Sequence, residues 1–270
     1  MASYGWVVKH GIFVAPFGRF ADPHKLIDLA ATAEESGWDG VFLWDHVLRP
    51  ESNEIIDTWV ALGAIAAATE RIRIGPMVTP VPRRRPIKLA REILTVDLMS
   101  DGRLTVGVGS GTDSHGELSR FDEIVDARER GARLDEGLDV IARLLEGETL
   151  AHVGTHFRVD GVSLEPRPIQ RPRPPIWCAA RGTAMKPARR AARYDGVFAI
   201  EVDADSFSRM LDEVRAVRGD LDGFDVCLRT EHDGEPPAFA ERGATWLLRA
   251  FPPVVEHEEV FTAVVHGPPR

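Results

Sequence analysis

The residues of this chain that are best suited to chemistry are Asp45 and His46, which directly follow the apolar run Gly40 to Trp44. Histidine titrates near neutral pH and a neighbouring carboxylate can fix its tautomer, so such a pair could exchange protons with a substrate. The run before the pair has no polar alternation, which is typical of a strand covered on both faces in a parallel sheet. Ligands of such sheets bind at the carboxyl ends of the strands, where this pair would lie.

A second candidate is the glycine-rich run Gly107-Val108-Gly109-Ser110-Gly111. Because glycine has no Cβ, backbone N–H groups here could approach an anion or a flat ring closely. A tight turn after a strand is the simpler explanation of the same glycines. The run is not the dinucleotide-binding fingerprint, since Thr112 and Ser114 interrupt it, and no Walker lysine follows.

Cationic residues are clustered, although the chain carries a net charge of −9. The first cluster is Arg83, Arg84, Arg85, Lys88 and Arg91, and the second is Arg181, Lys186, Arg189, Arg190 and Arg193. Both are expected beside the strand ends, where they would attract a phosphorylated cofactor. The alternative is solvated helix faces, which we favour for the last three arginines but not for Arg181. The acidic balance argues against nucleic acid as the main partner.

No metal site is expected. Barrel hydrolases that bind metal through residues such as Asp45, His46, Glu231 and His232 also need closely spaced ligands on the first strand, where this chain has Phe13, Ala15 and Phe17. The two cysteines, Cys178 and Cys227, each lie in an apolar run, which predicts packed thiols rather than a disulfide.

The order of elements that must position these residues predicts an α/β fold. The chain has 270 residues, 44% of them hydrophobic and 28% charged, which suits one globular domain over residues 1–270. Strand-like and helical runs alternate without a linker, and eight such units predict a single (β/α)8 TIM barrel. The predicted strands are Gly11 to Pro16, Gly40 to Trp44, Ile72 to Val78, Arg103 to Val108, Pro175 to Ala179, Gly196 to Ile200, Asp225 to Arg229 and Thr245 to Ala250.

Helix signals support this count. The first helix has Asp22 as N-cap and Pro23 at its first position, with Gly37 as its end. Two more helices are predicted over residues 57–69 and 86–101, and a fourth carries an apolar stripe of Leu134, Leu138, Ile141 and Leu145. The regular pattern breaks between the fourth and fifth strands, where a polar loop (111–117), this long helix and a hairpin within 149–168 predict an insertion.

The location predicted from the sequence is the cytoplasm. No segment resembles a membrane span, and Met1 to His10 lacks the basic and apolar regions of a secretion signal. The apolar second helix with Trp59 could pair with a second subunit as a homodimer, but a core position for Trp59 is the interpretation that we favour.

Several motifs in order resemble the bacterial luciferase-like family of flavin and deazaflavin oxidoreductases. They are Trp44-Asp45-His46, residues 70–80, the helix from Pro86, Gly107 to Gly111, and residues 165–170 with Pro175-Ile176-Trp177. The resemblance implies a TIM barrel that uses reduced FMN or coenzyme F420 to oxidise or reduce a small organic substrate, as an oxidoreductase or monooxygenase.

Roles of individual residues follow from the same resemblance. His46 would donate or accept the proton and Asp45 would orient it. Met77-Val78 matches a bulge that backs the cofactor ring, often through a non-proline cis peptide bond. Segments that hold the ribityl chain and phosphate match Ser110-Gly111 and Ala180-Arg181-Gly182. Phe17 and Thr79 complete the expected cofactor-binding residues.

The resemblance leaves the cofactor open between FMN and F420. Luciferase-type monooxygenases, which are fed by a separate reductase, tend to have Glu-His-His on the second strand, whereas Asp45-His46 is closer to the deazaflavin branch. The deazaflavin sugar-phosphate dehydrogenases carry Glu and Trp where this chain has Thr112 and Pro50, which argues against that substrate. Two other classes remain: a phosphate-binding barrel isomerase or hydrolase without a redox cofactor, and a non-catalytic cofactor-binding barrel.

Overall fold

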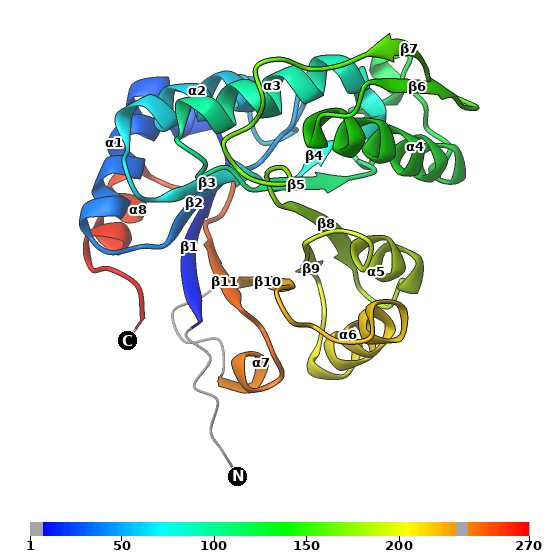
Figure 1. Ribbon diagram of the computed structural model, residues 1–270. Helices are drawn as coiled ribbons and strands as arrows, with labels where there is room; N and C mark the ends of the chain where they lie inside the picture. The colour runs from blue at the N-terminus through cyan, green and yellow to red at the C-terminus, as the bar shows by residue number, and fades with distance from the viewer. Residues whose placement is uncertain (1–7, 231–236, 270) are drawn as a thin grey trace.

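The computed structural model, which describes residues 8–230 and 237–269, is a parallel barrel surrounded by helices (Figure 1). Its strands are β1 (Lys9–Val14), β2 (Gly40–Leu43), β3 (Arg73–Pro76), β4 (Thr79–Pro80), β5 (Val106–Gly109), β8 (Ile176–Arg181), β9 (Gly196–Ile200), β10 (Asp225–Thr230) and β11 (Trp246–Ala250). They pair in the order β3-β2-β1-β11-β10-β9-β8-β5-β4. Because β3 and β4 are two parts of one strand, β3 pairing with β2 and β4 with β5, this order closes the predicted eight-position barrel.

The helices cover the outside of the barrel. They are α1 (Pro23–Glu35), α2 (Thr58–Ala68), α3 (Pro86–Met99), α4 (Ala127–Glu146), α5 (Met185–Ala191), α6 (Ala204–Arg218), α7 (Pro237–Glu241) and α8 (His257–Val265), with short 3-10 turns η1 (Gly18–Phe20), η2 (Val81–Arg83) and η3 (Ser119–Phe121). The start of α1 is as predicted, since the Asp22 carboxylate accepts the His24 N–H and Pro23 opens the helix. One face of α1, made of Leu26, Leu29, Ala30 and Ala33, is buried, as is the apolar stripe of α4.

The third strand differs from its prediction. It was expected to run unbroken over residues 72–78, but it is interrupted after Pro76, where the Met77-Val78 peptide bond is cis, and resumes at Thr79. The first strand begins two residues earlier than expected, at Lys9, and ends at Val14. A run of apolar residues marks a strand but does not show where its hydrogen-bond ladder is interrupted.

The insertion between the fourth and fifth barrel strands, β5 and β8, is present as predicted. It holds α4 and an antiparallel hairpin of β6 (Leu150–Val153) and β7 (Arg158–Val162). The Glu136 carboxylate on α4 accepts the N–H groups of His156 and Phe157, so the hairpin turn is fastened to the helix. Further along, the buried Asp97 of α3 accepts the N–H of Ile169 and so fixes the segment that leads into β8.

The other predictions about organisation have different outcomes. Both cysteines are free and buried, as expected. In the described residues no helix is long and apolar enough to cross a membrane. Glu231, His232 and most of the segment from Met1 to His10 lie outside the described residues. The cytoplasmic location stays a prediction.

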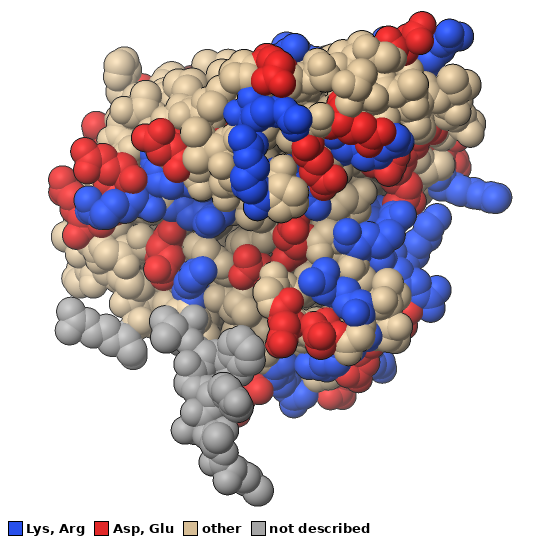
Figure 2. Space-filling model, viewed as in Figure 1, with Lys and Arg blue, Asp and Glu red and all other residues tan. Residues whose placement is uncertain are grey.

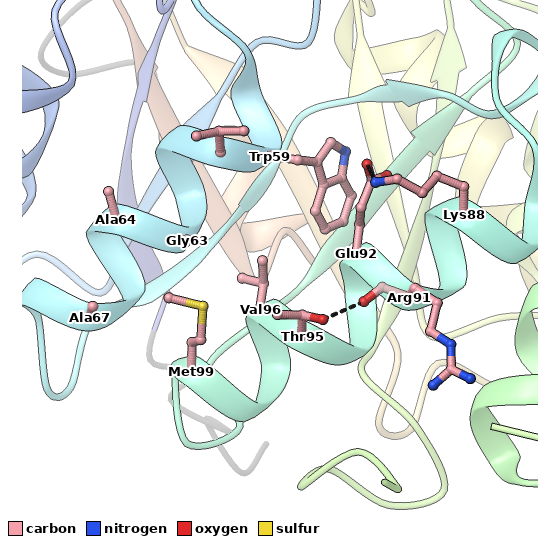
Figure 3. A pocket seen from close by; sticks show the side chains of 11 residues that line it. Trp59, Gly63, Ala64, Ala67, Lys88, Arg91, Glu92, Thr95, Val96 and Met99 are labelled. Atoms are coloured by element: carbon pink, nitrogen blue, oxygen red, sulfur yellow. Dashed lines mark hydrogen bonds and ion pairs between the residues drawn. The ribbon is translucent and has the colours of Figure 1, made fainter. Parts of the chain in front are cut away.

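The outer surface between α2 and α3 carries an open, largely apolar groove of about 520 Å³ (Figure 3). Trp59, Gly63 and Ala64 of α2 face Val96 and Met99 of α3 across it. Trp59 has only 4% of its surface exposed and donates its indole N–H to Thr79 Oγ1, so its predicted core position is confirmed. The floor of the groove is therefore formed by the core residue Trp59, with the small residues Gly63 and Ala64 beside it.

The end of the barrel opposite the strands' carboxyl ends is fastened by Glu34, at the end of α1. Its carboxylate accepts the N–H groups of Glu70, Arg71 and Ile72, which lead from α2 into β3. Burial works against ionisation of Glu34, but the backbone donors and Arg71 outweigh it, so its pKa lies below the usual value. The folded protein therefore contains Glu34 in its ionised form, in which the carboxylate accepts these backbone N–H groups.

Replacing Glu34 by Gln should lower the free energy of unfolding at neutral pH by about 1–2 kcal/mol, because the amide keeps only one acceptor oxygen. A lowered folded pKa means that the wild-type advantage is complete above the pKa of the unfolded chain and is lost as the pH falls through the folded pKa. Urea unfolding at neutral and acidic pH measures this. Glu35→Gln, an exposed neighbour on α1, is the control and should change stability little. A constant difference between the Glu34 variant and wild type at every pH would contradict the assignment.

Candidate active site at the barrel mouth

All barrel strands are parallel, so their carboxyl ends open at one end of the barrel, here called the mouth. His46 follows β2, Ser110 follows β5 and Arg181 ends β8. The topology thus brings to one end residues that are far apart in the sequence, as predicted.

His46 is held by a glutamate that the sequence analysis did not single out. Its Nδ1 lies 2.8 Å from Glu117 Oε2, and the other oxygen of that carboxylate accepts the Val47 N–H at 2.7 Å and an N–H of Arg83 at 2.8 Å. The His46 side chain is 24% exposed and that of Glu117 only 6%. The imidazole is therefore fixed on one side and open to solvent in part.

Glu117 is ionised at neutral pH. Burial alone would raise its pKa, but the hydrogen bond and charge of His46, the Val47 N–H and Arg83 outweigh burial and lower the pKa to about 2. An ionised carboxylate can only accept hydrogen bonds, so Oε2 of Glu117 faces His46 Nδ1 as an acceptor.

Asp45 has partners other than His46. Its carboxylate, 3% exposed, accepts the Thr79 hydroxyl at 2.7 Å, Arg84 Nη2 at 2.9 Å and Arg83 Nη2 at 3.3 Å. The expectation that Asp45 orients His46 is therefore corrected: Glu117 makes that contact. Residues adjacent in sequence need not touch, and the Asp45 carboxylate instead reaches residues that lie 34 to 39 positions further along the chain.

The first cationic cluster also has a different role from the one expected. Arg83 and Arg84 were predicted to attract a phosphorylated cofactor, but Arg83 bridges Asp45 and Glu117, and Arg84 bridges Asp45 and Glu92. Their charges are neutralised inside the protein. A signal for this was present in the sequence, since an acidic residue in the loop after the fourth strand lies at the mouth and needs a cation if it is buried.

The cis bond between Met77 and Val78, which the family resemblance predicted, forms a bulge beside the mouth. Met77 is buried and Val78 half-buried. A Cβ on Gly107 would lie 2.3 Å from the Pro76 carbonyl oxygen and 2.5 Å from Met77 Sδ, and one on Gly109 would lie 2.9 Å from Val78 Cγ2. These two glycines therefore leave space for the bulge, which is neither of the two explanations, a ligand or a tight turn, that their sequence pattern suggested.

The remaining expected residues lie on either side of this bulge. Ser110 is half-buried and Gly111 has a left-handed backbone with φ of +70°. Arg181 is exposed and pairs with Glu201 at 2.8 Å, while the Gly182 N–H donates to the Ile200 carbonyl. Ala180 is buried beneath them. The two segments that the resemblance assigns to the cofactor's ribityl chain and phosphate thus lie at the mouth, where Arg181 is paired with an acidic residue, and their binding role stays a prediction.

Two other expected residues are buried. Phe17 is 1% exposed and packs edge-on against Trp44, with ring centroids 5.9 Å apart. Thr79 is fully buried, and its hydroxyl both accepts from Trp59 and donates to Asp45. Both residues therefore support the mouth from the interior, and a direct contact of either with a cofactor stays a prediction.

The arginines of the second cationic cluster on and after α5 are divided between surface and interior: the side chains of Arg189 and Arg193 are exposed, whereas that of Arg190 is only 7% exposed. Figure 2 shows basic side chains gathered over α5 and α6, with acidic ones among them. Arg189 pairs with Glu213, and Arg190 and Arg193 both pair with Asp135. The prediction of solvated helix faces is therefore confirmed for Arg189 and Arg193 and is wrong for Arg190, whose buried charge is paired with Asp135.

Comparison with known proteins identifies related sequences. Residues 4–252 match the family model described as luciferase-like monooxygenase. An F420-dependent glucose-6-phosphate dehydrogenase of Microbacterium testaceum is 37% identical over 166 residues, 60% of this chain and 48% of that protein. The oxygenase component of the flavin-dependent trigonelline monooxygenase of Acinetobacter baylyi is 30% identical over 162 residues, 58% of this chain and 43% of that protein. The chain thus spans about half the length of the curated relatives it matches.

Solved structures agree on the fold. The monooxygenase RslO1 of Streptomyces bottropensis superimposes with a TM-score of 0.78 at 23% identity, over 95% of this chain and 96% of that one. The F420-dependent tetrahydromethanopterin reductase of Methanopyrus kandleri gives 0.78 at 17% identity, over 97% and 98% of the two chains. At these identities the likeness shows the barrel alone.

Replacing Gly107 by Ala should lower the free energy of unfolding by about 1–3 kcal/mol, because the new methyl group has no space beside the bulge. Urea unfolding tests this. Gly131→Ala on α4 is the matched control, since its Cβ would meet only Arg190 Nη2 at 3.8 Å and alanine favours a helix. Equal stability of the Gly107 variant and wild type would show that the bulge does not require this glycine.

Proposed function

Because the chain belongs to the luciferase-like monooxygenase family, we propose that it is an oxidoreductase that exchanges a hydride between coenzyme F420 and a small organic substrate. The observation that carries the proposal is the imidazole of His46, held at the mouth by ionised Glu117. When an alcohol is oxidised by hydride transfer from its carbon, the hydroxyl proton must also leave, and in the reverse reaction a carbonyl oxygen must gain a proton. The site therefore needs one group that accepts or donates this proton. The F420-dependent relative is more similar to this chain than the flavin-dependent one, at 37% against 30% identity, which supports F420 over FMN.

The residues at the mouth fit a flat, hydrogen-bonding ring. Phe17, Trp44, Met77 and Val78 belong to the apolar cluster there. Within residues 8–230 and 237–269, the buried indole Nε1 of Trp44 has no hydrogen-bond partner, and its ring lies 5.8 Å from that of His46. A buried donor without a partner is costly, and a carbonyl or ring nitrogen of a ligand would satisfy it.

Each candidate residue then has a task. Met77 and Val78 would support the ring, and the backbone of Ser110-Gly111 and of Ala180 to Gly182 would hold the chain and phosphate. His46 would accept the proton that a substrate hydroxyl releases, and would return it in the reverse direction. Bound F420 would supply the hydride acceptor or donor.

The second candidate is the oxygenase component of a flavin-dependent monooxygenase that receives reduced FMN from a separate reductase. The specific observation in its favour is the 30% identity to the Acinetobacter baylyi oxygenase component. The same apolar wall and imidazole would serve FMN. Glucose 6-phosphate is not part of either proposal, because Thr112 and Pro50 occupy positions where the deazaflavin sugar-phosphate dehydrogenases carry Glu and Trp.

The cofactor is tested by titrating the protein with F420 and with FMN, each oxidised and reduced, and following absorbance and fluorescence. We expect preferential binding of F420. Preference for reduced FMN, followed by an oxygen-dependent spectral intermediate, would replace the reductase proposal by the monooxygenase one. Binding of neither, with anaerobic turnover of a phosphorylated substrate, would favour an isomerase or hydrolase. Tight binding without turnover of any acceptor would favour a non-catalytic barrel.

Replacing His46 by Ala should lower turnover about 10²-fold or more, because the substrate proton loses its acceptor. The cofactor Kd, measured by the same titration, should stay near the wild-type value, because the apolar residues proposed to support the cofactor ring are unchanged. His24→Ala, an exposed histidine on α1, is the control. Unchanged turnover of the His46 variant would remove this residue from the mechanism.

We also propose that the groove between α2 and α3 binds a second copy of the chain. Val60 is 74% exposed beside it, and α2 is apolar all round, as in helices buried within an assembly. The rim of the groove carries both signs of charge, with Lys88 and Arg91 next to Glu92. A two-fold axis between two copies could therefore place the basic residues of one copy against the acidic residue of the other.

Replacing Val60 by Glu should shift the protein from dimer toward monomer and weaken association at least about tenfold, because it buries an unpaired charge in the interface. Sedimentation equilibrium measures this. Val217→Glu on α6, where the side chain is 49% exposed, should leave the association unchanged. A wild-type protein that stays monomeric at high concentration would contradict the proposal.

A further inference from the structure

The two oxygens of the Glu117 carboxylate have different partners. Oε1 accepts two hydrogen bonds, from the Val47 N–H at 2.7 Å and from Arg83 Nη1 at 2.8 Å. Oε2 faces His46 Nδ1 at 2.8 Å. Neither donor to Oε1 can reverse its role, because a backbone N–H and a guanidinium have no acceptor atom on their nitrogens.

The carboxylate cannot rotate away from this arrangement without losing other contacts. Arg83 is 9% exposed on its side chain and is held from its other nitrogen by Asp45 at 3.3 Å. The backbone directly after Glu117 is fixed as well, since Asp113 Oδ1 accepts the N–H groups of Leu118 at 2.7 Å and Ser119 at 2.9 Å. Glu117 thus presents one oxygen to the protein and the other to His46.

The imidazole has the complementary asymmetry. Its Nδ1 faces an acceptor that carries no proton, whereas within the described residues no hydrogen bond reaches Nε2. A neutral imidazole carries a proton on one nitrogen only, and the hydrogen bond at one nitrogen decides the state of the other.

We propose that Glu117, held by Arg83, is a positioning residue that fixes neutral His46 as the Nδ1–H tautomer, and that Nε2 is thereby the ring nitrogen that accepts a proton from the substrate. This inference rests on the proposed function only for its last step. The tautomer itself is a property of the ligand-free protein. Asp45, the neighbour of His46 in sequence, acts on the ring only through Arg83.

Glu117→Gln is a near-isosteric test with a specific outcome. Val47 N–H and Arg83 both require an acceptor, so they select the amide oxygen of the new side chain for the Oε1 position. The amide NH₂ then points at His46 Nδ1, which must become an acceptor. The tautomer should therefore invert, with the proton on Nε2 and the lone pair turned toward the amide, where it no longer faces the substrate.

Two-bond ¹H–¹⁵N correlation NMR of the ligand-free protein, with the His46 signal assigned by its loss in His46→Ala, distinguishes the two tautomers at a pH where the ring is neutral. We expect Nδ1–H in the wild type and Nε2–H in the Glu117 variant. Glu148→Gln, a carboxylate paired with Arg143 at the end of α4, makes the same chemical change elsewhere and should keep the wild-type tautomer. An Nε2–H wild type, or an unchanged tautomer in Glu117→Gln, would overturn the proposal.

Turnover is the second measurement. In Glu117→Gln we expect kcat to fall about 10²-fold or more with the cofactor Kd unchanged, as for loss of a general base. Wild-type kcat combined with an inverted tautomer would overturn the role of Nε2 as proton acceptor. If neither F420 nor FMN binds, the proposed function fails, whereas the NMR result still decides the tautomer.

Discussion

The arrangement of the mouth depends on one guanidinium, that of Arg83, shared between two buried carboxylates. Asp45 is 3% exposed and Glu117 5%, and burial of a charged carboxylate is costly unless a cation and hydrogen bonds compensate it. Arg83 supplies a cation to both, and Glu117 also contacts His46 and Val47 directly, so the end of β2 and the loop after β5 are joined at these two carboxylates. His46 is oriented by Glu117 within this cluster, and removal of Arg83 would take from the buried Glu117 carboxylate its guanidinium partner, whereas Asp45 would keep Arg84.

The interruption of the third strand connects the mouth to the outer surface. Because β4 restarts at Thr79, the buried Thr79 hydroxyl lies between the Trp59 indole, which donates to it, and the Asp45 carboxylate, which accepts from it. Trp59 also forms the floor of the groove between α2 and α3. Two hydrogen bonds thus separate the proposed dimer surface from the carboxylate that holds Arg83 and Arg84.

Much of the fold could be predicted from the sequence because its determinants are local. Asp22 and Pro23 start α1, as their chemistry requires, and the α4 stripe with Leu134 and Leu138 is buried as its spacing predicts. The glycines at 107 and 109 show the limit of such reasoning. Their positions were recognised, but the reason for them is contact with Pro76, Met77 and Val78, on a different strand.

The barrel, the insertion after the fourth strand and the presence of His46 at the mouth can all be predicted from the amino-acid sequence, because strand periodicity, caps and chain order depend on residues that are near one another in the chain. The acid that orients His46 becomes visible in the folded protein alone. Asp45 is adjacent in sequence but binds Thr79, Arg83 and Arg84, whereas Glu117, 71 residues away, reaches the imidazole. The physical reason is that a buried carboxylate takes the partners that the folded backbone brings within hydrogen-bonding distance, and distance in space between loops of a barrel is set by strand pairing and not by separation along the chain.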